Sequence, residues 1–228
     1  MSDRNKRYAA LLLLLAGMPH GCTYVSAATN LPPITPPKPQ VQSNIEQTVG
    51  DFSFTLEGGK MVTSNYQGSQ LNKAILGAWK ERGYIRDQSY VENGAFSGAA
   101  DYDLTLSGSQ YGESSIGLQI LSGLTLFLLP YYVTQNYDLH YALKDTKSGQ
   151  LYNASVQDSE TIYIELFLLF ALPWAVHNHN ANMARLGDHL YEQLRAQGAF
   201  QQAQPAGEGV IPGPEATPVA DPAGSAAP

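Results

Sequence analysis

The stretch Ile116–Val133, IGLQILSGLTLFLLPYYV, carries no charge and lies between two segments whose apolar residues alternate as in β-strands. A second apolar run, Thr161–Val176, has the sequence TIYIELFLLFALPWAV. Both runs end in leucine, proline, an aromatic residue and then valine before polar sequence resumes. Runs of this kind indicate contact with a membrane or burial inside protein.

The sequence around the two runs predicts an α+β domain over residues 51–198. Apolar residues alternate with polar ones in four segments, which we predict to be strands: 52–57, 101–107, 136–143 and 152–157. Apolar residues recur at helical spacing in 69–82 and 182–197, and Gly83 and Gly198 follow these two helices. The predicted order is β-α-β-[apolar]-β-β-[apolar]-α, in which the helices cover one face of the sheet as a two-layer α/β sandwich.

Topology places both apolar runs at the same end of the predicted sheet. A helical crossover makes the first two strands parallel, and the last two strands form a hairpin around Lys147–Gln150. A single membrane crossing by 116–133 would separate strands that must share one sheet. The first run therefore dips into a membrane and returns, or it packs on protein, whereas the second could also cross a bilayer because only a helix follows it.

We expect the two runs to form one apolar lobe that contacts a membrane or a protein partner. The bulky side chains that would make this contact are Leu124, Phe127, Leu128, Tyr131, Tyr132, Phe167, Phe170 and Trp174. The tyrosines and the tryptophan are amphipathic rings of the kind that settle at headgroup depth.

The first 21 residues have the pattern of an export signal. Three basic residues precede an apolar run, 9–18, which is too short to cross a bilayer. Cys22, the only cysteine of the chain, follows Gly21. This arrangement resembles the processing site of bacterial lipoproteins, although Pro19 and His20 depart from the leucine-like and small residues of that pattern.

The resemblance implies that residues 1–21 are a signal peptide and that Cys22 carries diacylglycerol and an acylated amine as a membrane anchor. Thr23, where an aspartate would imply retention at the inner membrane, implies the periplasmic face of the outer membrane. The alternative is cleavage after Ala27, in the small-x-small manner, which leaves an unanchored protein.

Two further segments are predicted to lie outside the folded domain. Residues 22–50 contain five prolines and show no periodicity, so we expect a lipidated cysteine followed by an extended tether. Residues 199–228 are rich in Ala, Gly and Pro, and we expect a disordered tail. The element order between these segments resembles the small periplasmic α/β modules of proteobacterial envelope lipoproteins and of the Tol system's soluble component. That resemblance carries no functional residue.

Charge narrows the classes of partner. The chain has 13 Lys and Arg against 20 Asp and Glu, a formal net charge of −7. Removing residues 1–21 makes it more acidic, because they hold three basic residues and one acidic one. Nucleic acid is excluded as a partner, since phosphate binding needs clustered basic residues. No polybasic stripe for anionic lipid is present either, so membrane contact must be apolar.

The sequence contains some residues that could support chemistry, but none forms a recognisable catalytic motif. Glu165 is the only ionisable residue inside either run, and a carboxylate among apolar residues is a functional candidate in membranes. Candidate metal ligands are two histidines in the polar segment that follows the second run, together with Asp188 and His189. Asp101 and Asp103 are a candidate acid/base pair. The histidines in question are His177 and His179. In a helix, residues two apart point in different directions and could not share a metal.

We therefore expect a lipid-anchored envelope protein that acts as an interaction or assembly component, is not an enzyme and holds neither cofactor nor metal. Its expected partners are the membrane and an envelope protein. Two alternatives stay open, a periplasmic module that binds a lipid or another apolar ligand, and an envelope hydrolase that uses the carboxylates or a metal.

Overall fold

A long antiparallel hairpin forms the centre of the sheet. The computed structural model describes residues 23–27, 30–55, 59–125, 129, 131–165 and 172–201, with the backbone alone for 23–27, 164–165 and 172–176. The hairpin strands are β6, Tyr131–Asp145, and β7, Leu151–Glu165. The predicted tight turn joins them: the Asp145 carboxylate accepts the N–H groups of Lys147 and Ser148, and Gly149 adopts a φ of +73°.

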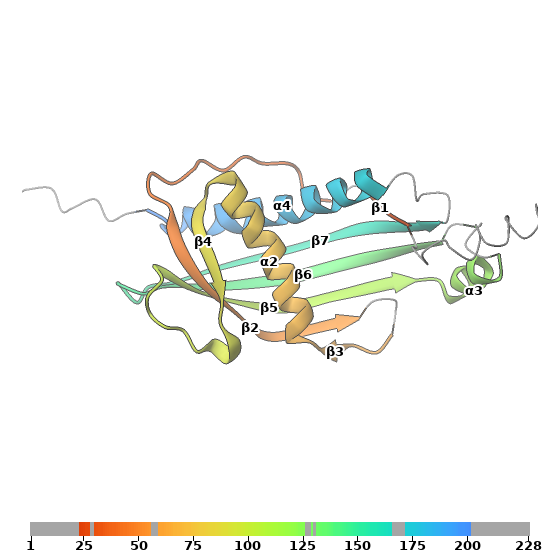
Figure 1. The fold of residues 1–228 in the computed structure, drawn as a ribbon, viewed down its shortest axis with the longest axis horizontal. Coiled ribbons are helices and arrows are strands. Elements are labelled where there is room, and N and C mark those ends of the chain that lie inside the picture. Colours follow the sequence, from red (N-terminus) through yellow and green to blue (C-terminus); the bar gives the residue numbers. More distant parts are fainter. Residues whose placement is uncertain are drawn as a thin grey trace, which may run out of the picture.

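The remaining strands complete one mixed sheet of seven strands in the order β1-β7-β6-β5-β2-β3, with β4 paired to β2 (Figure 1). Their bounds are β1, Thr23–Ala27; β2, Ser43–Thr55; β3, Val62–Thr63; β4, Ile85–Tyr90; and β5, Tyr102–Ser114. β2 runs parallel to β5, and β5 runs antiparallel to β6, as the topology argument predicted. β5 and β7 therefore point the same way, so both apolar runs do leave at the same end of the sheet.

In the part of the chain that the structure describes, three α-helices and one 3-10 turn accompany the sheet. They are α2, Asn65–Arg82; α3, Ile116–Leu124; α4, Leu172–Ala196; and the 3-10 turn η1, Glu92–Gly94. α2 begins at Asn65 and not at Ser69 as predicted, and its N-cap is Ser64, whose hydroxyl accepts the N–H of Gln67. It ends at Gly83, in the left-handed conformation that suits glycine.

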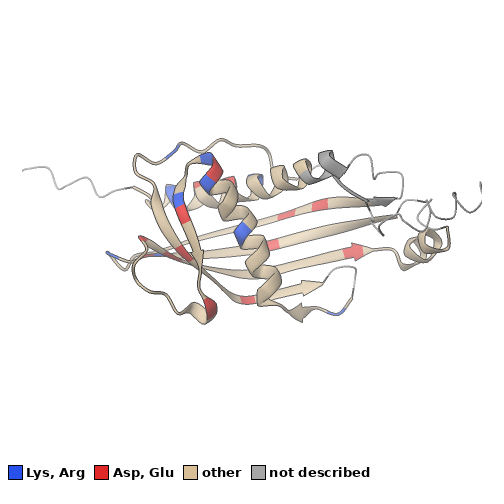
Figure 2. Ribbon diagram, in the orientation of Figure 1, with Lys and Arg blue, Asp and Glu red and all other residues tan. Residues whose placement is uncertain are grey.

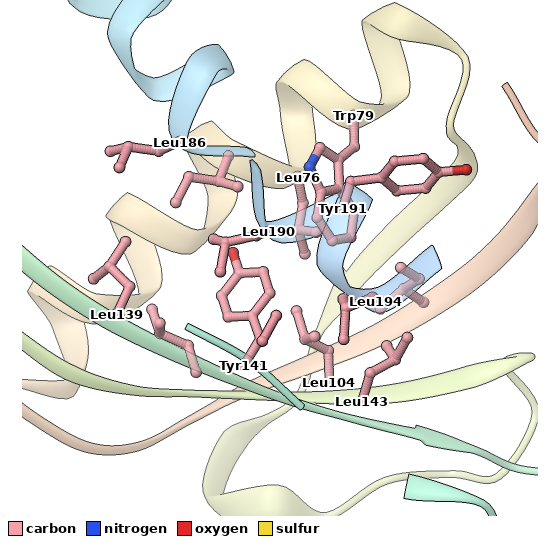
Figure 3. Close-up of a cluster of buried hydrophobic side chains, with 14 of the residues drawn as sticks. Leu76, Trp79, Leu104, Leu139, Tyr141, Leu143, Leu186, Leu190, Tyr191 and Leu194 are labelled. Atoms are coloured by element: carbon pink, nitrogen blue, oxygen red, sulfur yellow. The ribbon is translucent and has the colours of Figure 1, made fainter. Parts of the chain in front are cut away.

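The α+β sandwich is confirmed, with α2 and α4 packed on one face of the sheet. In the core, leucines of α4 meet alternate residues of the central strands, such as Leu139, Tyr141 and Leu143 (Figure 3). The Trp79 ring packs edge-on against Tyr141, and its Nε1 donates a 2.7 Å hydrogen bond to the Gly187 carbonyl. The two helices are thereby tied together over the sheet.

The expected start of the domain at residue 51 is wrong, and so is the free tether over 22–50. β1 adds to the edge of β7, and β2 already begins at Ser43. The proline-rich chain between them lies against the domain. Its contacts include Asn30 N–H to the Asp158 carboxylate at 2.9 Å and His189 Nε2 to the Pro32 carbonyl at 2.8 Å. Prolines suit this position because an extended chain outside the sheet needs no N–H partner.

The tail also begins later than predicted, because Ala199 and Phe200 are buried in the core. The Phe200 ring stacks on Tyr191 at a centroid distance of 5.0 Å, and its N–H donates to the Tyr102 hydroxyl. Residues 202–228 lie outside the described part of the chain. The domain therefore extends at least two residues beyond the predicted limit of 198.

Gln193 of α4 and Gln197, which directly follows the helix, cover part of the β7 edge that β1 leaves open. The Gln193 amide accepts the N–H of Ser155 and donates to its carbonyl, at 3.1 and 2.8 Å. Gln197 makes the same pair of bonds with the backbone of Asn153. Each side-chain amide thus replaces one peptide of a neighbouring strand, so the backbone of Asn153 and Ser155 is not available for pairing with another chain.

The similar endings of the two apolar runs do not correspond to similar structures. Tyr131–Val133 begins strand β6, whereas Leu172–Val176 is the first part of α4. Tyrosine and valine favour strands, and an alternating segment follows them. Pro173 instead falls at the second position of a helix, where its missing N–H costs nothing.

Candidate functional site

Helix α3 projects from the end of the sheet at which β5 and β7 stop (Figure 1). The helix begins after Ser115 and ends at Thr125, whose hydroxyl donates to the Leu121 carbonyl at 3.0 Å. The Leu129 N–H donates to the Thr125 hydroxyl, and the buried Ser122 hydroxyl donates to the Leu129 carbonyl at 2.7 Å. These bonds hold Leu129 against the helix.

Among the described residues, α3 packs on the domain through Leu118. Leu118 lies against a small apolar cluster of Tyr131, Val133 and Ile162, which is separate from the main core. These strand residues are on the same sheet face as Leu139, because side chains of a strand alternate between its faces. α3 therefore covers the far end of the face that α2 and α4 cover elsewhere.

The other side of α3 exposes large apolar side chains. The exposed fractions are 70% for Ile116, 59% for Ile120 and 78% for Leu124. On the opposite face of the same sheet end, Tyr132 and Tyr163 are neighbours across β6 and β7, with ring centroids 6.3 Å apart and both rings exposed. We call these five residues the apolar end.

None of the five residues of the apolar end is charged, and the charged residues at the same end of the sheet are Glu113 of β5 and Glu165 of β7. The sequence has no charged residue between Glu113 and Asp138, and Figure 2 shows α3 without a Lys, Arg, Asp or Glu. An exposed apolar patch without charge is unusual on a soluble surface and marks a site of contact with protein, membrane or ligand. Among the helices that the structure describes, none combines the length and apolar character needed to cross a membrane.

The predicted contact residues fall into three groups. Leu124 and Tyr132 are exposed, as a contact surface requires, while Tyr131 is buried in the small cluster and cannot serve as predicted. Its position alternates with Tyr132 along β6, so only one of the two tyrosines can face outward. Outside the described residues lie Cys22, Phe127, Leu128, Phe167 and Phe170, and of Trp174 only the backbone, in α4, is described.

Strand β1 brings the N-terminal part of the chain to the apolar end. It pairs antiparallel with β7, so that Ala27 lies opposite Thr161 and Thr23 lies opposite Glu165. Glu165 is the last residue of β7 and belongs to the sheet end that carries α3. The predicted lipidation site, Cys22, is the residue immediately before Thr23.

A second candidate site is a buried carboxylate between β7 and α4. Glu160 accepts hydrogen bonds from the Tyr137 hydroxyl at 2.6 Å and from the Asn182 amide at 2.8 Å, and it lies 3.2 Å from Nδ1 of His179. Burial alone would raise the pKa of Glu160. The hydrogen bonds from His179 and Tyr137, the charge of His179 and the Asn182 bond outweigh burial and lower this pKa from 4.5 to about 2.

This cluster holds the first half of α4 on the sheet, since Tyr137 and Glu160 belong to strands and His179 and Asn182 to the helix. All the neighbours of the carboxylate named above are donors, so the arrangement favours the charged carboxylate and fits a structural role. Glu160 is not among the candidate residues predicted from the sequence. The alternation of Tyr152, Ala154 and Val156, continued along β7, would have placed it on the buried face.

The other chemical candidates are dispersed. Asp101 accepts the Asn44 N–H and pairs with Lys147, which lowers its pKa, while burial and the nearby Glu46 raise the pKa of Asp103. The two aspartates thus have different partners. Glu165 ends β7, and its side chain is not described.

The histidine candidates do not converge on a metal. His177 and His179 both lie in α4, and His189, as noted, contacts the Pro32 carbonyl, away from both. Asp188 is buried with Arg82 and Tyr84. Within the described residues, no three His, Cys, Asp or Glu side chains come close enough to hold a metal ion.

Comparison with known proteins found distant structural likeness alone. No family model and no curated protein matches the chain. A Xanthomonas campestris protein of the family DUF330 is 11% identical, covers 78% of this chain and 99% of its own, and has a TM-score of 0.36. A neuraminyllactose-binding hemagglutinin homolog from Helicobacter pylori is 11% identical, covers 69% and 85%, and has a TM-score of 0.37.

The PelC dodecamer from Paraburkholderia phytofirmans is 10% identical over 75% of this chain and 98% of its own, with a TM-score of 0.31. Likenesses at this level do not transfer a function to the chain.

Proposed function

We propose that the protein is a lipid-anchored component of the bacterial cell envelope that works by contact at the membrane and not by catalysis. The observation that carries this proposal is the apolar end, where Ile116, Ile120 and Leu124 are exposed on a helix without charge. The export signal and Cys22 support a membrane location, and the outer membrane is the expected address. An envelope protein bound beside the lipid is the expected further partner.

Cell fractionation tests the anchor. Wild-type protein is expected in the membrane fraction and labelled by a radioactive fatty acid, whereas Cys22→Ser is expected to lose the label and leave that fraction. Unlabelled wild-type protein would overturn lipidation, and would favour cleavage after Ala27. A photo-crosslinking residue at position 124, compared with one at the exposed Tyr66 of α2, identifies what the apolar end touches.

A second candidate function is binding of an apolar ligand, favoured by a groove of about 550 Å³ between α2 and α4. Small or apolar residues line about half of it, namely Ala74, Gly77, Ala78, Ala181, Met183 and Ala184, and charged or polar residues line the rest: Lys73, Glu81, Arg82, His177 and Asn180. Native mass spectrometry of purified protein would reveal a bound lipid, and protein without ligand would count against this candidate. The hydrolase alternative has no comparable support, because its candidate residues are dispersed.

A further inference from the structure

Strand β1 leaves no linker between the anchor site and the sheet. Consecutive Cα atoms are about 3.8 Å apart, so Cys22 cannot lie far from Thr23, which pairs with the last residue of β7. The segment that precedes Thr23 is therefore joined to the domain at the apolar end, with no spacer between them. This is the opposite of the long tether that the prolines suggested.

Thr23, the residue after the anchor site, and α3 belong to the same end of the sheet. The sheet order places β7 and β6 between β1 and β5, and α3 follows β5 directly. Neighbouring strands are about 4.8 Å apart, so β1 and β5 are separated by about 14 Å across the sheet. Lipid on Cys22 would bring the exposed side of α3 to the same bilayer surface.

The chemistry of the apolar end fits a bilayer surface. A helix of nine residues is about 14 Å long and cannot cross the hydrocarbon core, but it can lie in the interface with its apolar side in the acyl region. Tyr132 and Tyr163 add a pair of exposed rings at the same end, and tyrosine is enriched at headgroup depth. Because no residue between Glu113 and Asp138 is charged, α3 itself brings no charge to the lipid, whereas Glu113 and Glu165, at the ends of β5 and β7, must stay in the headgroup layer.

We propose that the domain stands end-on on a phospholipid bilayer, with the acyl chains of Cys22 and the exposed side of α3 inserted together and Tyr132 and Tyr163 at the headgroups. This inference rests on the proposed function, because it requires the lipid on Cys22. The anchor holds α3 at a high effective concentration next to the bilayer, so a short helix suffices as the second contact. Two contacts at a fixed separation then set the orientation of the domain.

A fluorescent label tests the insertion of α3. Cys22 is the only cysteine, and lipid occupies its thiol, so an introduced cysteine is a unique labelling site. Leu124→Cys and Leu151→Cys form a matched pair, since both leucines are exposed and Leu151 begins β7 at the opposite end of the sheet. Each variant is lipidated in cells, labelled with an environment-sensitive dye and reconstituted into phosphatidylcholine vesicles with or without lipid-borne quencher.

We expect the dye at position 124 to shift to the blue and to lose most of its emission to the quencher, and the dye at position 151 to do neither. A dye at 124 that is as exposed to water as the dye at 151 would overturn insertion while leaving the anchor intact. A dye at 124 that is shielded from water but not quenched would overturn the lipid contact in favour of a second copy of the chain. Loss of the proposed function itself is seen separately, as absence of lipid on Cys22.

Discussion

Replacing Glu160 by glutamine tests whether a charged carboxylate fastens α4 to the sheet. The pKa of Glu160 falls from 4.5 to about 2 on folding. Since one pKa unit corresponds to about 1.4 kcal/mol, the charged carboxylate contributes about 3 kcal/mol to the free energy of unfolding at neutral pH. The side chain is 1% exposed, so solvent screening takes little from this figure.

The sign of the pH dependence follows from the lowered pKa. The folded state binds the proton of Glu160 less tightly than the unfolded state, so the stabilisation is complete above pH 4.5 and is lost as the pH falls toward 2. Between pH 5 and pH 3 the loss amounts to about 2 kcal/mol. Glu160→Gln lacks this titration, so the difference between the two proteins should shrink over the same interval.

Urea unfolding of both proteins at pH 5, 4 and 3 measures this difference. We expect Glu160→Gln to be less stable by about 3 kcal/mol at pH 5 and by about 1 kcal/mol at pH 3. Glu192→Gln is the control, because Glu192 lies on the same helix but pairs with Arg195 at the surface, where such pairs contribute little. A difference for Glu160→Gln that stays constant with pH would refute the reasoning.

The covered edge of β7 and the contact between α2 and α4 at Gly187 give two further predictions. Replacing both Gln193 and Gln197 by alanine removes the hydrogen bonds that cover the β7 edge. The variant should associate in a concentration-dependent manner in analytical ultracentrifugation. A variant that stays monomeric at all concentrations would show that the edge needs no cover. Gly187→Ala would place its Cβ 2.9 Å from Nε1 of Trp79 and should lower the free energy of unfolding by about 1–3 kcal/mol. Gly77→Ala is the control, because its Cβ would lie in open space on α2, and it should raise the free energy of unfolding by about 0.5–1 kcal/mol. Equal effects of Gly187→Ala and Gly77→Ala would contradict the packing described.

The regular part of the fold could be predicted because its sequence signals are local. Alternation of apolar residues fixed the core of the β6–β7 hairpin, and the helical spacing of Leu71, Ile75 and Trp79 fixed α2. The parallel pairing of β2 with β5 followed from the crossover rule. These elements bury one face, so the pattern that predicts them is the same pattern that stabilises them.

The missed elements depend on partners far along the chain. β1 is a strand because it pairs with the edge of β7, and the sequence of Thr23–Ala27 alone does not predict this pairing. β4 buries one of its six residues, so it lacks the alternation of a one-faced strand. The two apolar runs were each treated as one unit, although α3 and the start of β6 divide the first run, and β7 and α4 share the second.

The candidate site was predicted in part. The exposure of Leu124 and Tyr132 agrees with the predicted contact surface, and the buried Tyr131 does not. The position of Thr23 at the same sheet end as α3 could not be foreseen, because it depends on the pairing of β1 with β7. The Glu160 cluster was missed since its donors come from Tyr137, His179 and Asn182, on two other elements.

The height of the hairpin turn above the bilayer tests the end-on orientation most directly. The fifteen residues of β7 extend over about 50 Å from the apolar end to the turn. A donor dye on Ser148→Cys, in that turn, and acceptor dyes on the lipid headgroups report this height by energy transfer in vesicles that carry the lipidated protein. Our account predicts a height of about 40 Å or more once tilt is allowed for, and a turn that lies within about 20 Å of the bilayer surface would contradict it.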